Sequence, residues 1–228
     1  MTTYVFAHGS YQGGWIWKPL AENLRRLGHT AYAPSLDGCG DRRQALRAGI
    51  TTESQAEDLA SLIFHEDLEQ VVLVGTSSGG MVVCKTAELI RERVKSLCFI
   101  SAVALLDGEK ISDQVRAPTQ ITDALSVAPS REDAEQRWAA LLPPKERQWA
   151  LERYSPHPID VYRRAVDLPR FWSQDWDATV IWCKRSALPP VEHQRRTTER
   201  LRARFHELDA GHLAALSHWK ELTPLLPA

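Results

Sequence analysis

A serine lies at the centre of a glycine-bounded turn, Gly75-Thr76-Ser77-Ser78-Gly79, which fits the pattern G-x-S-x-G. The turn follows the apolar run Gln70–Gly75 and precedes a helical run that begins near Met81, so a strand, a sharp turn and a helix are predicted. Small flanking residues let neighbouring backbone pass close by while the serine hydroxyl stands clear of the strand end. We therefore expect Ser77 to be a nucleophile.

Two other segments supply groups that such a serine needs. His212 follows the last short apolar run, and catalytic groups of parallel sheets gather where strands end, so it is the expected general base. The backbone N–H of Ser78 is expected to contribute to an oxyanion hole, and a second N–H is expected from the turn His8-Gly9-Ser10. In this turn, Gly9 is expected to contact substrate and His8 to brace the backbone.

Short apolar runs alternate with amphipathic stretches along the chain. The expected strands are Tyr4–His8, Thr30–Pro34, Gln70–Gly75, Ser96–Ser101, Ala178–Cys183 and Phe205–Leu208. The expected helices are Trp17–Leu27, one that begins with capping-box spacing from Ser54 to Glu57, Met81–Arg91, Val191–Arg202 and Ser217–Leu226. This alternation predicts an α/β fold with a doubly wound, mostly parallel sheet, in a single domain over residues 1–228.

Residues 103–176 interrupt this alternation. The segment contains helical stretches, several prolines and many aromatic residues, but no obvious strand. An ordered helical cap, inserted before the penultimate strand, is favoured over a disordered linker because of the aromatic content. Trp138 and Trp149 of this cap are expected to contact an apolar or aromatic substrate.

Three segments together resemble the α/β-hydrolase superfamily: FAHGSYQGGWIWKPLAENLRRLGHTAYAPSLDGCGDR, VLVGTSSGGMVV and ELDAGHLAALSHWKEL. The likeness is to the branch of hydroxynitrile lyases, plant methylesterases and similar small esterases, and it covers most of the chain outside the cap. It implies the α/β-hydrolase fold, with Ser77 as nucleophile, His212 as base and the amides of Ser10 and Ser78 as oxyanion hole. Leu213 stands where hydroxynitrile lyases of the plant type carry lysine, which argues against cyanohydrin chemistry.

The same resemblance implies an Asp in the turn after the penultimate strand, and this chain has none there. The turn reads WCKRSALP, so that Ser186 takes the place of the acid. Asp107, at the start of the cap, is an alternative acid, and a Ser–His pair without a third member is another. Loss of the orienting Asp costs on the order of 10⁴ in kcat in serine proteases, so a neutral replacement favours activated esters or lactones.

Composition excludes several classes of protein. The chain has 228 residues, with 28 Lys and Arg against 29 Asp and Glu, so no basic excess favours nucleic acid as a partner. No apolar run approaches the ~18–20 residues that cross a bilayer, and the opening residues lack the features of a secretory signal. The 4 cysteines form no CxxC pair, which predicts a reduced, cytoplasmic compartment without structural zinc.

The predicted function is a serine-dependent hydrolase of a small carboxylic ester or lactone, without metal or cofactor. The partner is the small-molecule substrate alone, and a homodimer is left open. Two alternatives remain: a lyase or cyclase that uses Ser77 and His212 for proton transfer, and a binding protein that has lost catalysis.

Overall fold

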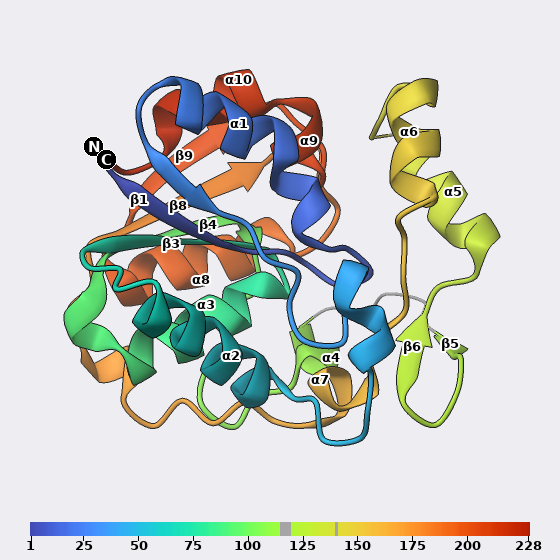
Figure 1. Ribbon diagram of the computed structural model, residues 1–228, viewed down its shortest axis with the longest axis horizontal. Coiled ribbons are helices and arrows are strands. Elements are labelled where there is room, and N and C mark those ends of the chain that lie inside the picture. Colours follow the sequence, from blue (N-terminus) through green and yellow to red (C-terminus); the bar gives the residue numbers. More distant parts are fainter. Residues whose placement is uncertain (115–119, 140) are drawn as a thin grey trace.

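Six parallel strands form the central sheet, in the order β2-β1-β3-β4-β8-β9 (Figure 1). The computed structural model describes residues 1–114, 120–139 and 141–228. The strands are β1 (Thr3–Ala7), β2 (Thr30–Tyr32), β3 (Val71–Ser77), β4 (Val94–Ala102), β8 (Ala178–Cys183) and β9 (Arg204–Leu208). Each lies close to its predicted range, because apolar runs bounded by turns mark buried parallel strands well.

The inner strands of the sheet are buried on both faces, which explains why they are largely apolar. In β1, Tyr4 and Phe6 pack on one face, while Val5 and Ala7 pack on the other. Helices α1 (Lys18–Arg26), α9 (Ala214–Ser217) and α10 (Trp219–Leu222) cover the first face. Helices α2 (Thr52–His65), α3 (Gly79–Leu89) and α8 (Val191–Leu201) cover the second. The α/β-hydrolase architecture predicted from the sequence is confirmed.

Two helix predictions are wrong in their details. The capping box of α2 begins at Thr51, whose hydroxyl accepts the Ser54 N–H at 3.2 Å while the Ser54 hydroxyl accepts the Thr51 N–H at 3.0 Å. The predicted closing helix is broken at His218 into α9, α10 and a 3-10 turn. The 3-10 helices are η1 (Gly14–Trp17), η2 (Gly40–Ala45), η3 (Arg91–Arg93), η4 (Phe171–Ser173) and η5 (Thr223–Leu225).

Much of the segment between β4 and β8 lies beyond the carboxyl ends of the strands, and its last part returns along the core beside α3 (Figure 1). Its helices are α4 (Ile111–Gln114), α5 (Arg131–Ala139), α6 (Pro144–Leu151) and α7 (Ile159–Arg163). It also holds an antiparallel sheet of β5 (Gln120–Ile121), β6 (Ser126–Ala128) and β7 (His157–Pro158). The cap therefore has the helices expected from the sequence and also three short strands, which were not predicted because strands of two or three residues show no detectable periodicity.

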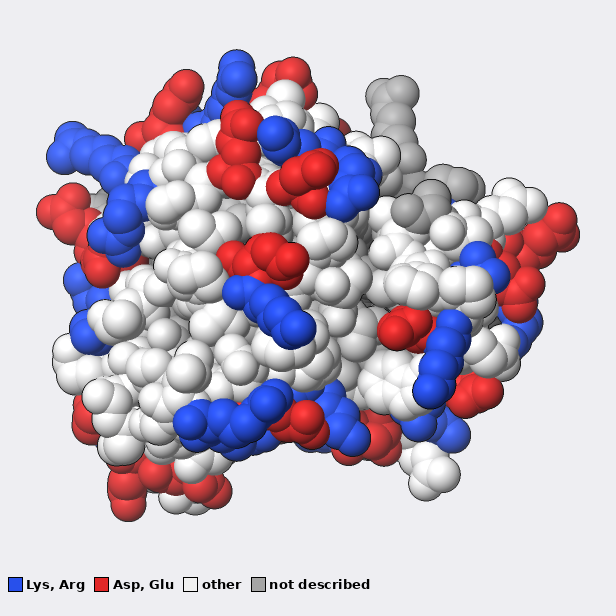
Figure 2. All heavy atoms as spheres, turned by 90° about the horizontal axis from the view of Figure 1, so that it is seen from above, with Lys and Arg blue, Asp and Glu red and all other residues white. Residues whose placement is uncertain are grey.

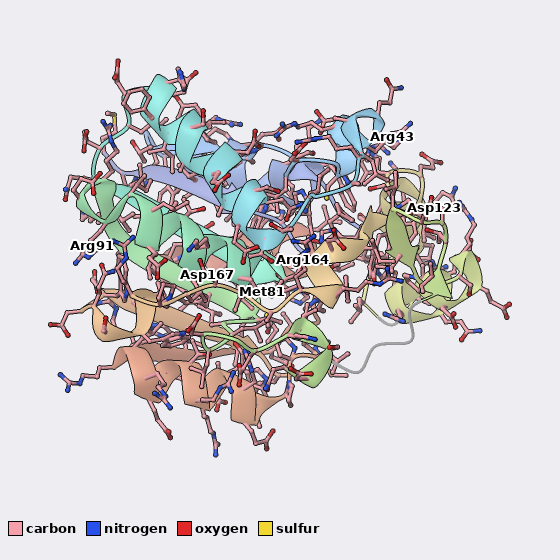
Figure 3. The ribbon with its side chains drawn as sticks, turned by 90° about the horizontal axis from the view of Figure 1, so that it is seen from below. Arg43, Met81, Arg91, Asp123, Arg164 and Asp167 are labelled. Atoms are coloured by element: carbon pink, nitrogen blue, oxygen red, sulfur yellow. The ribbon has the colours of Figure 1, made fainter. Side chains whose placement is uncertain are left out.

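An ion network with Lys85 and Glu88 buried and Asp167 exposed fixes the chain where it returns from the cap to the core. Lys85 Nζ of α3 lies 2.9 Å from Glu88 Oε1 and 3.2 Å from Asp167 Oδ2. The other oxygen of Glu88 accepts the N–H groups of Arg170 and Phe171 at 2.8 and 2.7 Å. Figure 3 shows Asp167 beside α3, the helix that follows the serine turn. The cap is thus tied to the helix that positions Ser77.

Charged side chains of both signs are interspersed over the surface seen in Figure 2. Within the described parts of the chain, no helix has the length and apolar character that a membrane span requires. The 4 cysteines are free and buried.

Candidate active site

The serine turn joins β3 to α3 and holds Ser77 in the left-handed region, with φ of 51°. A non-glycine residue adopts this conformation only where the surroundings impose it, and such strain concentrates at functional sites. A side chain at Gly79 would collide with the carbonyl oxygen of Ala7, so only glycine lets α3 start this close to β1. The strained turn therefore presents the Ser77 hydroxyl at the carboxyl end of the sheet.

The turn after β1 lies directly against this serine. A Cβ built on Gly9 would stand 2.6 Å from Cβ and 3.2 Å from Oγ of Ser77, so glycine is required by close approach. The Gly9 N–H donates to Gln12 Oε1 at 3.0 Å. The hydroxyls of Ser10 and Ser78 are 2.8 Å apart, so the structure brings the two expected oxyanion-hole residues together.

The imidazole of His8 holds this turn in place through two hydrogen bonds. Its Nε2 accepts the Leu36 N–H at 2.9 Å, which leaves Nδ1 to donate to the Gly9 carbonyl at 2.8 Å. The side chain is fully buried, and burial lowers the pKa of His8 to about 4. His8 is therefore a neutral structural residue at pH 7, in the role expected from the sequence.

His212 and Ser186 are in direct contact. Ser186 Oγ lies 3.0 Å from Nδ1 of His212 and 2.6 Å from the carbonyl oxygen of Leu188. That carbonyl can only accept, so the Ser186 hydroxyl donates its one proton to Leu188 and accepts the Nδ1–H of His212. The proton of the neutral imidazole is thereby held on Nδ1, and Nε2 is the nitrogen able to act as a base.

The environment of His212 favours the neutral ring. Burial, followed by the positive charge of Arg137, lowers the pKa of His212 to about 4 from its ordinary value of 6.5. A carboxylate partner would oppose both effects, and the hydroxyl of Ser186 does not carry the charge to do so. His212 is therefore available as a base over the whole neutral range but has little tendency to hold a proton.

The structure places the alternative acid Asp107, and also Asp209 of the histidine loop, in other contacts. Asp107 Oδ1 accepts the Leu168 N–H at 2.8 Å and so caps the segment that returns from the cap. Asp209 pairs with Arg185 at 3.2 Å and is 75% exposed. The hypothesis that Asp107 replaces the triad acid is therefore wrong: its carboxylate serves the chain between β4 and β8 rather than His212.

A cavity of about 340 Å³ opens over these groups. Ser77, His212 and Ser186 line it, together with Ser10. Its apolar lining is Val103, Ile111, Trp138, Leu141, Leu188, Pro189 and Leu213. Such a size and lining suit a small, largely apolar molecule.

The two cap tryptophans behave differently. Trp138 lines the cavity, as expected. Trp149 does not: its ring packs edge-on against Trp15 at 5.5 Å, and the guanidinium of Arg153 lies 4.1 Å from the ring centre. The expectation that Trp149 contacts substrate is therefore corrected, because its helix turns that ring toward α1 and the surface.

Sequence reasoning missed five polar residues that line the cavity: Tyr11, Gln12, Arg137, Tyr162 and Arg185. Tyr11 donates its hydroxyl proton to the hydroxyl of Tyr162 at 2.9 Å, and Arg137 projects from α5. Tyr11 and Arg137 adjoin residues that were singled out, but their orientation depends on the tertiary structure. Over residues 1–114, 120–139 and 141–228, no three His, Cys, Asp or Glu side chains gather as a metal site requires.

Comparisons with known proteins agree with this geometry. The family model described as "Alpha/beta hydrolase family" matches residues 4–224. A carbendazim hydrolyzing esterase from Nocardioides sp. (strain SG-4G) is 33% identical over 49% of this chain and 46% of its own length. An alpha-hydroxynitrile lyase from Arabidopsis thaliana is 25% identical over 75% of this chain and 69% of its own length.

Solved structures show the same fold. A methylesterase from Arabidopsis superposes with a TM-score of 0.78 at 19% identity, covering 98% of this chain and 96% of that one. The chain spans about half the length of the first of these curated relatives, since the aligned part is 46% of the carbendazim esterase. The expected likeness to hydroxynitrile lyases and plant methylesterases is confirmed.

Proposed function

Because the chain belongs to the alpha/beta hydrolase family, we propose that it hydrolyses small carboxylic esters or lactones through an acyl-enzyme on Ser77. One observation carries the proposal. Ser77, in its strained left-handed turn, lines the same cavity as His212, whose proton is held on Nδ1 by Ser186. A half-buried serine hydroxyl that shares a cavity with an imidazole whose Nε2 is basic is suited to nucleophilic catalysis of acyl transfer.

The reaction proceeds in two displacements. Nε2 of His212 takes the proton of Ser77 Oγ as this oxygen attacks the ester carbonyl. The backbone N–H groups of Ser10 and Ser78 stabilise the resulting oxyanion. His212 then gives its proton to the departing alcohol, and water, activated by the same Nε2, releases the acid from Ser77.

The neutral Ser186 limits the range of substrates. The hydroxyl fixes the tautomer of His212, but it does not offset the charge of the imidazolium that forms in the transition state. Carboxylates in this role account for roughly 10⁴ in kcat in serine proteases. We therefore propose esters with good leaving groups, or strained lactones, because these need less assistance by the base.

A non-hydrolytic reaction on the same residues is the second candidate. It is favoured by the neutral His212, which suits simple proton transfer, and by the likeness to a relative that is named an α-hydroxynitrile lyase. Leu213 in place of lysine argues against cyanohydrin cleavage itself.

Two measurements together separate the two candidates. One is labelling with a fluorophosphonate, detected by intact-protein mass spectrometry, and the other is the rate of ester hydrolysis. A hydrolase takes up one phosphonyl group and releases acid from a panel of 4-nitrophenyl esters and aryl lactones. A lyase, a cyclase or a binding protein leaves those esters intact. The His212→Ala variant is the matched control, which should lose both labelling and turnover.

Location and oligomeric state stay predictions. The free, buried cysteines support the proposed reduced cytoplasmic compartment. Size-exclusion chromatography with light scattering would report whether the enzyme is a homodimer.

A further inference from the structure

The cavity over Ser77 carries positive charge. Arg137 of α5 and Arg185 of the turn after β8 both line it, and no Asp or Glu occurs among its described lining residues. A cleft lined by charge of one sign and otherwise apolar walls concentrates ligands of the opposite sign. The cavity is therefore suited to an anion with an apolar body.

The two arginines are placed differently. Arg185 pairs with the carboxylate of Asp209 at 3.2 Å and donates to the Asp209 carbonyl at 2.6 Å, with 57% of its side chain exposed. Arg185 therefore lies at the exposed rim of the cavity. Arg137 is half-buried, and its positive charge adds to the effect of burial in lowering the pKa of His212. Arg137 is therefore the more enclosed of the two cations that share the cavity with Ser77 and His212.

We propose that Arg137 binds a carboxylate of the substrate, so that the preferred substrates are small esters or lactones with an anionic group on an apolar chain. This inference rests on the proposed serine hydrolase and specifies its substrate class. A guanidinium is suited to this task because its planar fork of N–H donors matches a carboxylate.

An anionic substrate also supplies what the triad lacks. His212 has a hydroxyl partner in Ser186 where a carboxylate is usual, and it lies in the field of Arg137. A substrate carboxylate on Arg137 brings negative charge into the cavity while His212 holds the proton. That charge offsets the repulsion between the two cations in the transition state, so the preference appears in kcat as well as in KM.

A matched pair of esters tests the proposal. Mono-(4-nitrophenyl) adipate and 4-nitrophenyl hexanoate share the chain length and the leaving group and differ in the terminal carboxylate. We expect the wild-type kcat/KM to be roughly 10- to 100-fold higher for the adipate, as one charge-assisted contact allows. In Arg137→Gln this ratio falls to about one, and in Arg137→Lys it takes an intermediate value. Arg131→Gln is the matched control, since Arg131 is on the same helix but pairs with Glu135 outside the cavity, and it keeps the wild-type ratio.

Three outcomes would decide against the inference. A wild-type enzyme that prefers the hexanoate, or that hydrolyses both esters equally, overturns it without any variant. A ratio that is the same in Arg137→Gln and in the wild type overturns it as well, provided that the variant still takes up fluorophosphonate on Ser77. If the wild type neither turns over an ester nor takes up the probe, the proposed function itself is refuted, and the inference with it.

Discussion

Replacing Ser186 by Asp should convert the neutral partner of His212 into a charged one. The native hydroxyl accepts the Nδ1–H of His212 at 3.0 Å and donates to the Leu188 carbonyl at 2.6 Å. Asp keeps the first contact and loses the second, because an ionised carboxylate is only an acceptor. Ser186→Asn is the matched control: its amide can make both contacts but carries no charge.

The size of the gain follows from the pKa of His212. Burial and Arg137 lower it to about 4, about 2.5 pH units below its ordinary value of 6.5. Restoring it would stabilise the imidazolium by ~3.4 kcal/mol at ~1.36 kcal/mol per unit. If about half of that is expressed in the transition state, as expected for general acid–base catalysis, kcat rises about 20-fold. The repulsion between the new carboxylate and the carbonyl of Leu188 subtracts from this gain.

The assay is kcat/KM on one 4-nitrophenyl ester across pH 4–9 for the wild type and both variants. In the wild type, activity should fall only near pH 4, because His212 must be neutral to act as a base. In Ser186→Asp the maximum rate should increase and the acid limb should move toward pH 6.5, while Ser186→Asn keeps both near the wild type. Equal profiles for Asp and Asn would refute the argument that charge is what the triad lacks.

Three further results are expected. Gly9→Ala should lower kcat by at least about tenfold, because its Cβ would stand 2.6 Å from Cβ of Ser77 and displace the serine; a wild-type rate would show that the turn gives way. Trp138→Ala should change relative kcat/KM among esters, whereas Trp149→Ala should leave substrate preference as it is, because only Trp138 lines the cavity; equal shifts would contradict the placement. The free energy of unfolding should fall between pH 7 and pH 5, as measured by urea titration. The reason is that burial lowers the pKa of four histidines, so the unfolded chain binds more protons below pH 6.5, which costs up to ~2 kcal/mol each at pH 5. They are His8, His157, His193 and His212, and a flat profile would contradict their lowered pKa values.

The strands and the serine turn were predictable because local sequence determines them. Runs such as residues 71–74 are apolar on both faces and are followed by glycine, as expected of a buried parallel strand before a tight turn. The start of α2 was misplaced because Thr51 and Ser54 form a capping box that pairs two hydroxyl residues instead of a hydroxyl and a Glu.

Positions within the cap were not predictable in the same way. Trp138 and Trp149 are the same residue type on neighbouring helices, and only the packing of α5 and α6 decides which ring faces the cavity. The sequence did not indicate that Arg137 lines the cavity, since a lone arginine on a polar helix usually faces solvent. Ser186 was found through the resemblance, which implies an acid in the turn after the penultimate strand, whereas Asp107 lies on a chain whose path depends on the cap.

The acyl-enzyme on Ser77 is the most direct test of the whole account. Wild-type protein mixed with a 4-nitrophenyl ester, quenched in acid within the first turnovers and digested, should carry the acyl group on the peptide that contains Ser77. The same experiment on Ser77→Ala should give an unmodified peptide and no burst of nitrophenol. An acyl group on another residue, or turnover that persists in Ser77→Ala, would contradict the claim that Ser77 is the nucleophile.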